Sequence, residues 1–223
     1  MHQRKSKKLL FYFFLLIITS SISNISLNNL KFDKFLSINI SGLTQKDNLA
    51  LRRKVERLNV KNIFFMNKKD ISEIFSSNSL IERYEIFLKY PYTIDIKIVK
   101  TNFLAKINRN GKIFLIGSNG KLISYKLDNI DIPFIFGIPQ VSEFLKFKNI
   151  LDSSKFSYEQ IENLYFFPSK RWDIEFRNKI ILKLPRENVR NALDDVFKFF
   201  KNSNMNNIKT IDVRVKNQII LND

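Results

Sequence analysis

The sequence contains no cysteine and a single histidine, His2. The absence of cysteine excludes disulfides, thiolate metal ligands and a cysteine nucleophile. One histidine at a charged terminus excludes ordinary zinc sites and histidine-based catalysis. Alanine is also scarce, with only Ala50, Ala105 and Ala192. Catalysis by carboxylates stays possible with this composition.

The net charge is +17, from 38 lysine and arginine residues against 21 acidic residues. An excess of this size is typical of proteins that bind nucleic acid or an anionic membrane surface. Lysine, asparagine, isoleucine and phenylalanine are all abundant, and A+T-rich coding produces the same bias in a protein of any function. Both explanations stay open, so the charge does not identify a function.

Segments that resemble functional motifs are better explained by structure. A P-loop ending at the GSNGK segment (117–121) would need glycine at 115 and serine or threonine at 122, where the sequence has leucine. Asp194 and Asp195 are adjacent, and adjacent helical residues do not face each other. In FKFFKN (197–202) the spacing puts Phe197 and Phe200 on a buried helix face and the lysines in solvent. We therefore predict no enzyme activity, cofactor, metal site, small-molecule substrate or nucleic-acid partner.

The N-terminus has the pattern of a targeting segment. Residues 1–8 are basic, and residues 9–30 carry no charge, which as a helix would extend about 33 Å. A retained signal anchor and a cleaved signal peptide both fit, and the basic flank predicts a cytoplasmic N-terminus. We expect one transmembrane helix over 9–30, whose strongly apolar residues are Leu9, Leu10, Phe11, Phe13, Phe14, Leu15, Leu16, Ile17 and Ile18.

Short strands and helices alternate from residue 35 to residue 101. The alternating segment 35–43 predicts a strand, and helical spacing predicts helices over 45–58 and after Asn67. Two strands follow over 80–90 and 92–100. The predicted order is β-α-α-β-β, with a core formed by Ile38, Leu51, Val55, Ile96 and Ile98.

The remaining chain, 102–223, reads as a β-rich domain with flanking helices. We predict a meander over 103–125, an irregular crossing near Pro133 and Gly137, and a helix from Val141 to Leu151. A capping box at Ser157 predicts another helix. A hairpin over 171–185, a helix over 186–201 and one strand over 210–221, bent at Lys216-Asn217, complete an α+β fold.

Ordered segments of the sequence resemble the FtsQ/DivIB family of bacterial cell-division proteins. The segment IERYEIFLKYPYTIDIKIVKTNFLAKI (81–107) resembles the strand, "YP" turn and strand of that family, and NGKIFLIGSNGKLI resembles its glycine-containing segment at Gly120. The most specific likeness is RWDIEFRNKIILKLPRENVRNALDDVFKFF followed by TIDVRV, which matches a hairpin, a helix and an "iDlR" strand in the same order. Val215 departs from the family, which has an aromatic residue there.

The resemblance implies a domain layout. Residues 1–8 would be a cytoplasmic basic tail, 9–30 a transmembrane signal anchor, 35–101 a POTRA domain and 102–223 a C-terminal β domain. The protein would be a single-pass type II protein of the bacterial inner membrane, with a periplasmic C-terminus, at the division septum.

The resemblance also implies a function. The protein would be a non-enzymatic divisome component that links early and late division proteins and binds FtsB and FtsL. FtsB would be added as a strand along Arg214, Val215, Lys216, Asn217 and Ile219. Exposed strand edges favour such addition on physical grounds as well. Two alternatives stay open: a secreted or anchored basic protein that binds an anionic surface, and a POTRA-type docking protein of envelope assembly.

Overall fold

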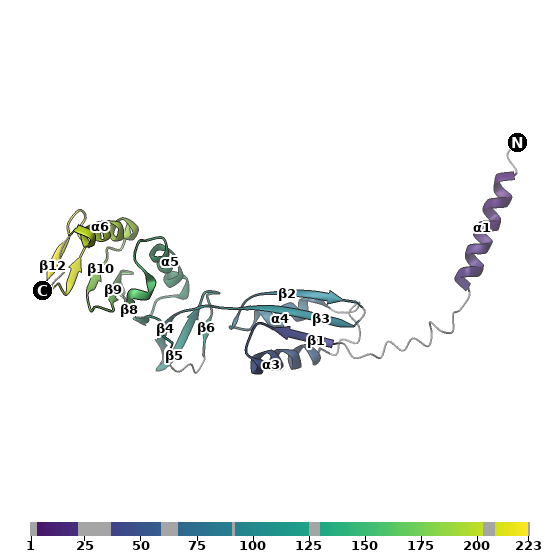
Figure 1. The fold of residues 1–223 in the computed structure, drawn as a ribbon, viewed down its shortest axis with the longest axis horizontal. Coiled ribbons are helices and arrows are strands. Elements are labelled where there is room, and N and C mark those ends of the chain that lie inside the picture. The colour runs from purple at the N-terminus through teal and green to yellow at the C-terminus, as the bar shows by residue number, and fades with distance from the viewer. Residues whose placement is uncertain are drawn as a thin grey trace.

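The computed structural model describes residues 4–21, 37–58, 67–90, 92–124, 130–202 and 208–222. Within these ranges the chain forms a three-stranded sheet of order β1-β3-β2 and a nine-stranded sheet of order β12-β11-β10-β9-β8-β7-β4-β5-β6 (Figure 1). The α+β class and the β-rich C-terminal region agree with the sequence prediction.

The predicted transmembrane helix is wrong. The N-terminal helix is α1 (Arg4–Ser21), it lies apart from the other elements (Figure 1), and four of its first five residues are basic. Its uncharged part, Leu9 to Ser21, extends about 20 Å at 1.5 Å per residue, against about 30 Å for a bilayer core. No helix in the described ranges has the length and apolar character needed to cross a membrane. The side chains that were expected to span the bilayer are all exposed: Leu9, Leu10, Phe11, Phe13, Phe14, Leu15, Leu16, Ile17 and Ile18.

The three-stranded sheet has the predicted β-α-α-β-β order. The elements are β1 (Ser37–Ser41), α3 (Gln45–Glu56), α4 (Lys68–Ser76), β2 (Ile81–Lys89) and β3 (Thr93–Lys100). β3 lies in the centre, parallel to β1 and antiparallel to β2. Both helices begin at side-chain caps, because Thr44 accepts a hydrogen bond from the Asp47 backbone and Asn67 accepts one from the Lys69 backbone.

The core of this unit lies between the sheet and the two helices. The five residues predicted to pack together share one buried cluster with Ile71, Phe75, Ile81 and Ile94, which confirms that prediction. Alternation along the strands puts one face of each strand into this cluster and leaves the other face in solvent.

The nine-stranded sheet is built from short strands and covered on one face by two helices. Its strands are β4 (Phe103–Arg109), β5 (Lys112–Gly117), β6 (Leu122–Ile123), β7 (Phe134–Phe136), β8 (Ile161–Phe166), β9 (Trp172–Phe176), β10 (Ile181–Lys183), β11 (Thr210–Asp212) and β12 (Ile220–Asn222). The helices are α5 (Val141–Asp152) and α6 (Val189–Asn202). Trp172 is buried, and its ring stacks on Phe147 at a centroid distance of 4.7 Å.

Three segments differ from the sequence prediction. The helix expected after Ser157 is a single 3₁₀ turn (Tyr158–Gln160), which leads at once into β8. The crossing near Pro133 contains β7, which inserts in parallel between β4 and β8. The single strand expected over 210–221 is an antiparallel pair, β11 and β12, because the chain reverses after Val213.

The two sheets meet at a junction of polar and apolar contacts. The Asn119 side-chain amide donates to the carbonyl oxygens of Ser79 and Ile81, both at 2.9 Å. Glu82 accepts hydrogen bonds from the hydroxyls of Thr101 and Ser118, at 2.9 and 2.8 Å. A small buried cluster of Leu80, Leu115 and Ile123 adds apolar contacts between the same two segments. Each contact joins the segment at β2 to the start of the second sheet, so the junction is packed on both sides.

Candidate partner-binding site

The C-terminal hairpin places a strand edge at one end of the nine-stranded sheet. β11 pairs with β10 on one side and with β12 on the other, so β12 is the edge strand of the described sheet. β12 carries two exposed apolar side chains, Ile220 and Leu221, with 43% and 39% of their surface accessible. An edge strand offers backbone donors and acceptors to another chain.

The residues predicted to bind a partner lie beside this edge rather than along it. Arg214, Val215, Lys216 and Asn217 are exposed and form the connection between β11 and β12. Asn217 has φ of 60°, which is the left-handed conformation that a tight reversal requires. Ile219 is half-buried and packs against the main core immediately before β12.

An ion pair fixes the start of this connection. The Arg214 Nε atom donates to both carboxylate oxygens of Asp212, at 2.8 and 2.9 Å, and the Arg214 backbone N–H donates to Oδ1 at 3.0 Å. The hydrogen bonds from Arg214 hold the pKa of Asp212 below its usual value. The same contact raises the pKa of Arg214, so both groups stay charged at neutral pH.

A second carboxylate lies two strands away in the same row. Asp173 on β9 and Asp212 on β11 both stand opposite Lys183 of β10. Asp173 is 3% exposed, and its burial raises its pKa, although Arg171 and the backbone N–H of Leu184 donate to its Oδ1. The two carboxylates therefore have opposite shifts, and neither contacts the other as an acid-base pair would.

A groove of about 530 Å³ lies between α6 and the β11–β12 connection. All five residues predicted to bind a partner line it, so the structure brings them to one place. The opposite wall comes from α6 and the segment before it, which the sequence prediction missed: Pro185, Glu187, Asn188, Asn191, Ala192 and Asp195. The polar residues Asn188, Asn191 and Asp195 recur at helical spacing beside the buried stripe, which is the signal that could have identified this wall.

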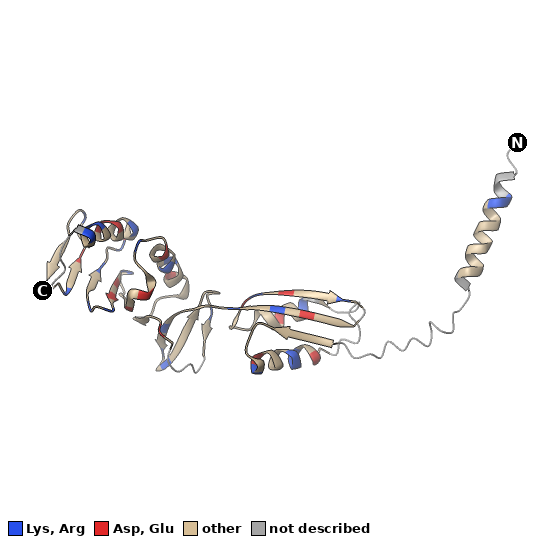
Figure 2. Ribbon diagram, viewed as in Figure 1, with Lys and Arg blue, Asp and Glu red and all other residues tan. Residues whose placement is uncertain are grey.

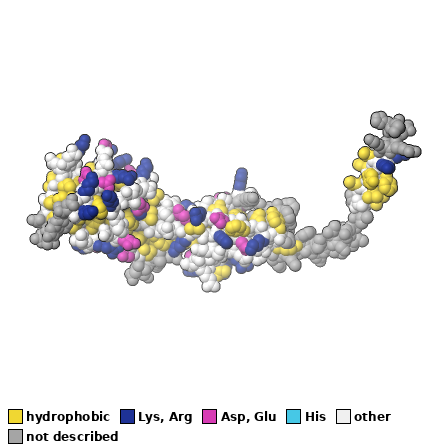
Figure 3. Space-filling view, turned by 45° about the horizontal axis from the view of Figure 1, so that its top comes forward, with side chains coloured by type: hydrophobic (Ala, Val, Ile, Leu, Met, Phe, Trp, Pro, Cys, Tyr) yellow, Lys and Arg dark blue, Asp and Glu magenta, His cyan; other side chains and the backbone are white. Residues whose placement is uncertain are grey.

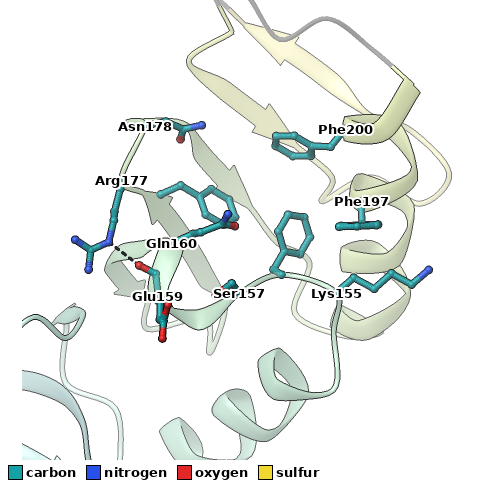
Figure 4. Close-up of a pocket in the computed structure, with 10 residues that line it drawn as sticks. Lys155, Ser157, Glu159, Gln160, Arg177, Asn178, Phe197 and Phe200 are labelled. Carbon is teal, nitrogen blue, oxygen red and sulfur yellow. Dashed lines mark hydrogen bonds between the residues drawn. The ribbon is translucent and has the colours of Figure 1, made fainter.

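A larger hollow of about 720 Å³ lies where the opposite end of α6 meets the β9–β10 turn (Figure 4). Its floor is aromatic, with the ring of Phe156 between those of Phe176, Phe197 and Phe200 at centroid distances of 5.4 to 5.8 Å. The Arg177 Nε atom at its rim donates to the Glu159 carbonyl oxygen at 2.5 Å. These contacts join the surrounding elements and bring no nucleophile to a base.

Charge is distributed rather than gathered. Both basic and acidic residues occur along the helices and strands of the two sheets (Figure 2), and the space-filling view shows them interspersed over the face in view (Figure 3). Within the described ranges no group of three or more histidine, cysteine or acidic residues could hold a metal ion. The edge strand β12 and the groove beside it are therefore the candidate site.

The family model for the C-terminal domain of cell division protein FtsQ/DivIB matches residues 101–214, about half of the chain. The chain belongs to the FtsQ/DivIB family. The matched region contains both α5 and α6 and nearly all of the nine-stranded sheet, and it ends at Arg214. FtsQ/DivIB proteins are cell-division scaffold proteins, so membership supports a role in the divisome and association with the division site.

Curated relatives carry the same name. The chain is 23% identical over 199 residues to cell division protein FtsQ of Rickettsia bellii, covering 83% of this chain and 70% of that protein. It is 24% identical over 186 residues to FtsQ of Rickettsia prowazekii, covering 80% and 68%. Among solved structures, it is similar to the major extracytoplasmic domain of the trans isomer of DivIB from Geobacillus stearothermophilus, with 13% identity and a TM-score of 0.33 over 44% of this chain and 87% of that one.

Proposed function

We propose that this FtsQ/DivIB protein is a non-enzymatic scaffold that links early and late division proteins at the septum and binds FtsB and FtsL. FtsB is received as an added strand on β12, with the groove between α6 and the β11–β12 connection taking the residues that flank the strand. The observation that supports this most directly is the position of β12 at the edge of the sheet with two exposed apolar side chains.

Strand addition fits the chemistry of this edge. Backbone hydrogen bonds supply affinity that does not depend on the partner's sequence, and alternate side chains supply selectivity. Ile220 and Leu221 lie next to each other in β12, so their side chains point to opposite faces of the sheet. An added strand would cover both faces at this edge, and Val215, which is 49% exposed, lies beside it in the groove.

We further propose that residues 35–101 form a POTRA domain that docks upstream division proteins, and that residues 102–223 form the partner-binding β domain. The β-α-α-β-β order of the first sheet supports the POTRA assignment. The separate hydrophobic clusters of the two sheets support a division near residue 101.

The test is a pair of proline variants in β12, Ile220→Pro and Leu221→Pro. Adjacent strand residues direct their N–H groups to opposite sides, so one proline removes a donor toward the open edge and the other removes one toward β11. We expect the variant that loses the donor toward the open edge to stay folded and to bind FtsB at least tenfold more weakly, which is about 1.4 kcal/mol. Binding is measured by titrating the full chain with FtsB, and FtsL is scored by co-purification.

Matched surface variants provide the control. Val215→Glu should weaken FtsB binding because it replaces an exposed apolar side chain of the groove with a carboxylate, whereas Ile138→Glu, at a position 77% exposed, should not. If every folded β12 and Val215 variant binds FtsB as tightly as the parent chain, the strand-addition proposal is wrong.

A further inference from the structure

The first strand of the three-stranded sheet has an edge that the proposed function does not use. β1 pairs only with β3 in the described sheet. The Ser37 backbone N–H donates to the Tyr92 carbonyl oxygen, so Ser37, Asn39 and Ser41 direct their backbone groups toward β3. Ile38 and Ile40 alternate with them and therefore direct their N–H and C=O groups toward the open edge.

A groove of about 440 Å³ runs between this edge and α3. Its apolar lining includes Leu43 and Leu49, and Leu49 is 46% exposed. Among the described residues that line it, Arg52 alone is charged, and its Nε atom lies 2.7 Å from Oε1 of Glu56. On a chain with a net charge of +17, this groove is a place where two copies can approach with little electrostatic repulsion.

The sequence of β1 is Ser-Ile-Asn-Ile-Ser, which carries no charged side chain, so pairing with a second copy of the strand places no like charges opposite each other. An interface with two-fold symmetry requires a surface that is complementary to itself. When two such strands pair antiparallel about Asn39, Ile38 lies opposite Ile40 of the second copy and Ser37 lies opposite Ser41. The outward backbone groups of Ile38 and Ile40 then form the hydrogen-bonded pairs. The Asn39 residues of the two copies stand opposite each other as a non-hydrogen-bonded pair.

We propose that β1 is a self-association edge, at which two copies of this chain pair antiparallel about Asn39 to form a continuous six-stranded sheet. Leu49 of α3 is covered by the second copy. A five-residue strand pair buries less area than a standard interface, so the dimer is weak, with a Kd on the order of micromolar or above. This surface lies in a different sheet from β12, so its failure would leave the proposed binding of FtsB untouched.

The absence of cysteine from the chain allows a register-specific cross-linking test. In a non-hydrogen-bonded antiparallel pair the two Cα atoms lie about 4.5 Å apart, which suits a disulfide. Full-length Asn39→Cys is therefore expected to form a disulfide dimer under mild oxidation. Ser37→Cys and Ser41→Cys lie on the same exposed sheet face and provide the matched controls.

Each control alone should form no disulfide dimer, because two copies of Ser37 would be four residues out of register, about 13 Å apart along the strand. An equal mixture of Ser37→Cys and Ser41→Cys should give the mixed dimer. If Asn39→Cys cross-links no faster than Ser37→Cys, or if the mixture gives no mixed dimer, the proposed pairing is wrong. Association through any other surface, including α1, would not reproduce this dependence on register.

Sedimentation equilibrium provides a second measurement without cysteine. Leu49→Lys places like charges in the interface and is expected to weaken dimerisation at least tenfold. Ala50→Lys adds the same charge at the neighbouring exposed position of α3 and should leave dimerisation unchanged. Equal effects of the two variants would contradict the proposal.

Discussion

Arg214 donates hydrogen bonds to Asp212 from both its side chain and its backbone, with Nε 2.8 Å from Oδ1 and the backbone nitrogen 3.0 Å from the same oxygen. Asp212 is the last residue of β11, and Arg214 begins the connection to β12. The pair therefore sets the direction in which the chain leaves the sheet and fixes one wall of the groove.

Asp212→Asn should lower the free energy of unfolding at pH 7 by about 1–2 kcal/mol, because it weakens charge-assisted hydrogen bonds to Arg214. The pKa of Asp212 is lowered from 3.8 in the folded chain, so its stabilising effect is complete above that value and is lost as the pH falls through the folded pKa. Urea unfolding from pH 7 to pH 2.5 should show the difference between parent and variant shrinking toward acid. A difference that is constant over this range would contradict the ion pair.

Asp173→Asn should change the pH dependence of stability in the opposite direction. Burial raises the pKa of Asp173 above 3.8, so the ionised form costs stability as the pH rises through its folded pKa. The amide oxygen of asparagine can still accept from the Leu184 backbone. We expect the variant to be within about 0.5 kcal/mol of the parent at pH 7, or more stable, and to gain relative to it between pH 3 and pH 7. A loss at pH 7 larger than that of Asp212→Asn would overturn this prediction.

Gly42 joins β1 to α3 at a point where no side chain fits. Its φ is 114°, and a Cβ atom there would lie 1.8 Å from the Ile98 carbonyl oxygen. Gly42→Ala should therefore destabilise the chain by about 3 kcal/mol or more, since β1 must move away from β3. Gly111→Ala is the control, because its φ is 77° but nothing lies within 4 Å, so only backbone strain of about 1 kcal/mol is expected. Equal losses in thermal unfolding would contradict the predicted close approach.

Phe147 packs beneath the only tryptophan, with the two rings 4° from parallel. Phe147→Ala should cost about 3–5 kcal/mol, because Phe147 is 3% exposed and truncation leaves a cavity. Trp172 fluorescence reports the change directly, and a shift to longer wavelength in the folded variant is expected as the indole becomes more hydrated. Phe136→Ala, on a side chain 45% exposed, is the milder comparison. A folded Phe147→Ala with an unshifted spectrum would contradict this packing.

The first sheet was predictable because its elements are local and carry clear periodicity. Ile94, Ile96 and Ile98 alternate along β3, and Leu51 and Val55 repeat at helical spacing, so each signal lies within one segment. The parts that were missed depend on distant pairing. β7 has three residues and is a strand because it lies between β4 and β8, which nothing in its own sequence specifies.

The C-terminal hairpin and α1 show two further limits. Lys216-Asn217 was interpreted as a bend within one strand, but the left-handed Asn217 helps the chain reverse and pair with itself. Counting uncharged residues gave a helix over 9–30, whereas α1 starts in the basic segment and ends at Ser21. The residues predicted to bind a partner nevertheless lie close together, because the connection between β11 and β12 lines one groove; their role in binding stays a prediction.

The junction around Asn119 connects the two sheets through hydrogen bonds that come from both of them. The Asn119 side chain holds two carbonyl oxygens of the first sheet's segment, Glu82 holds two hydroxyls of the second, and a shared apolar cluster adds to these contacts. Bending there would break several of these hydrogen bonds at once, so the junction resists a change in the angle between the two sheets of Figure 1. A force applied to β12 is therefore expected to displace the two sheets together and not to bend the chain between them.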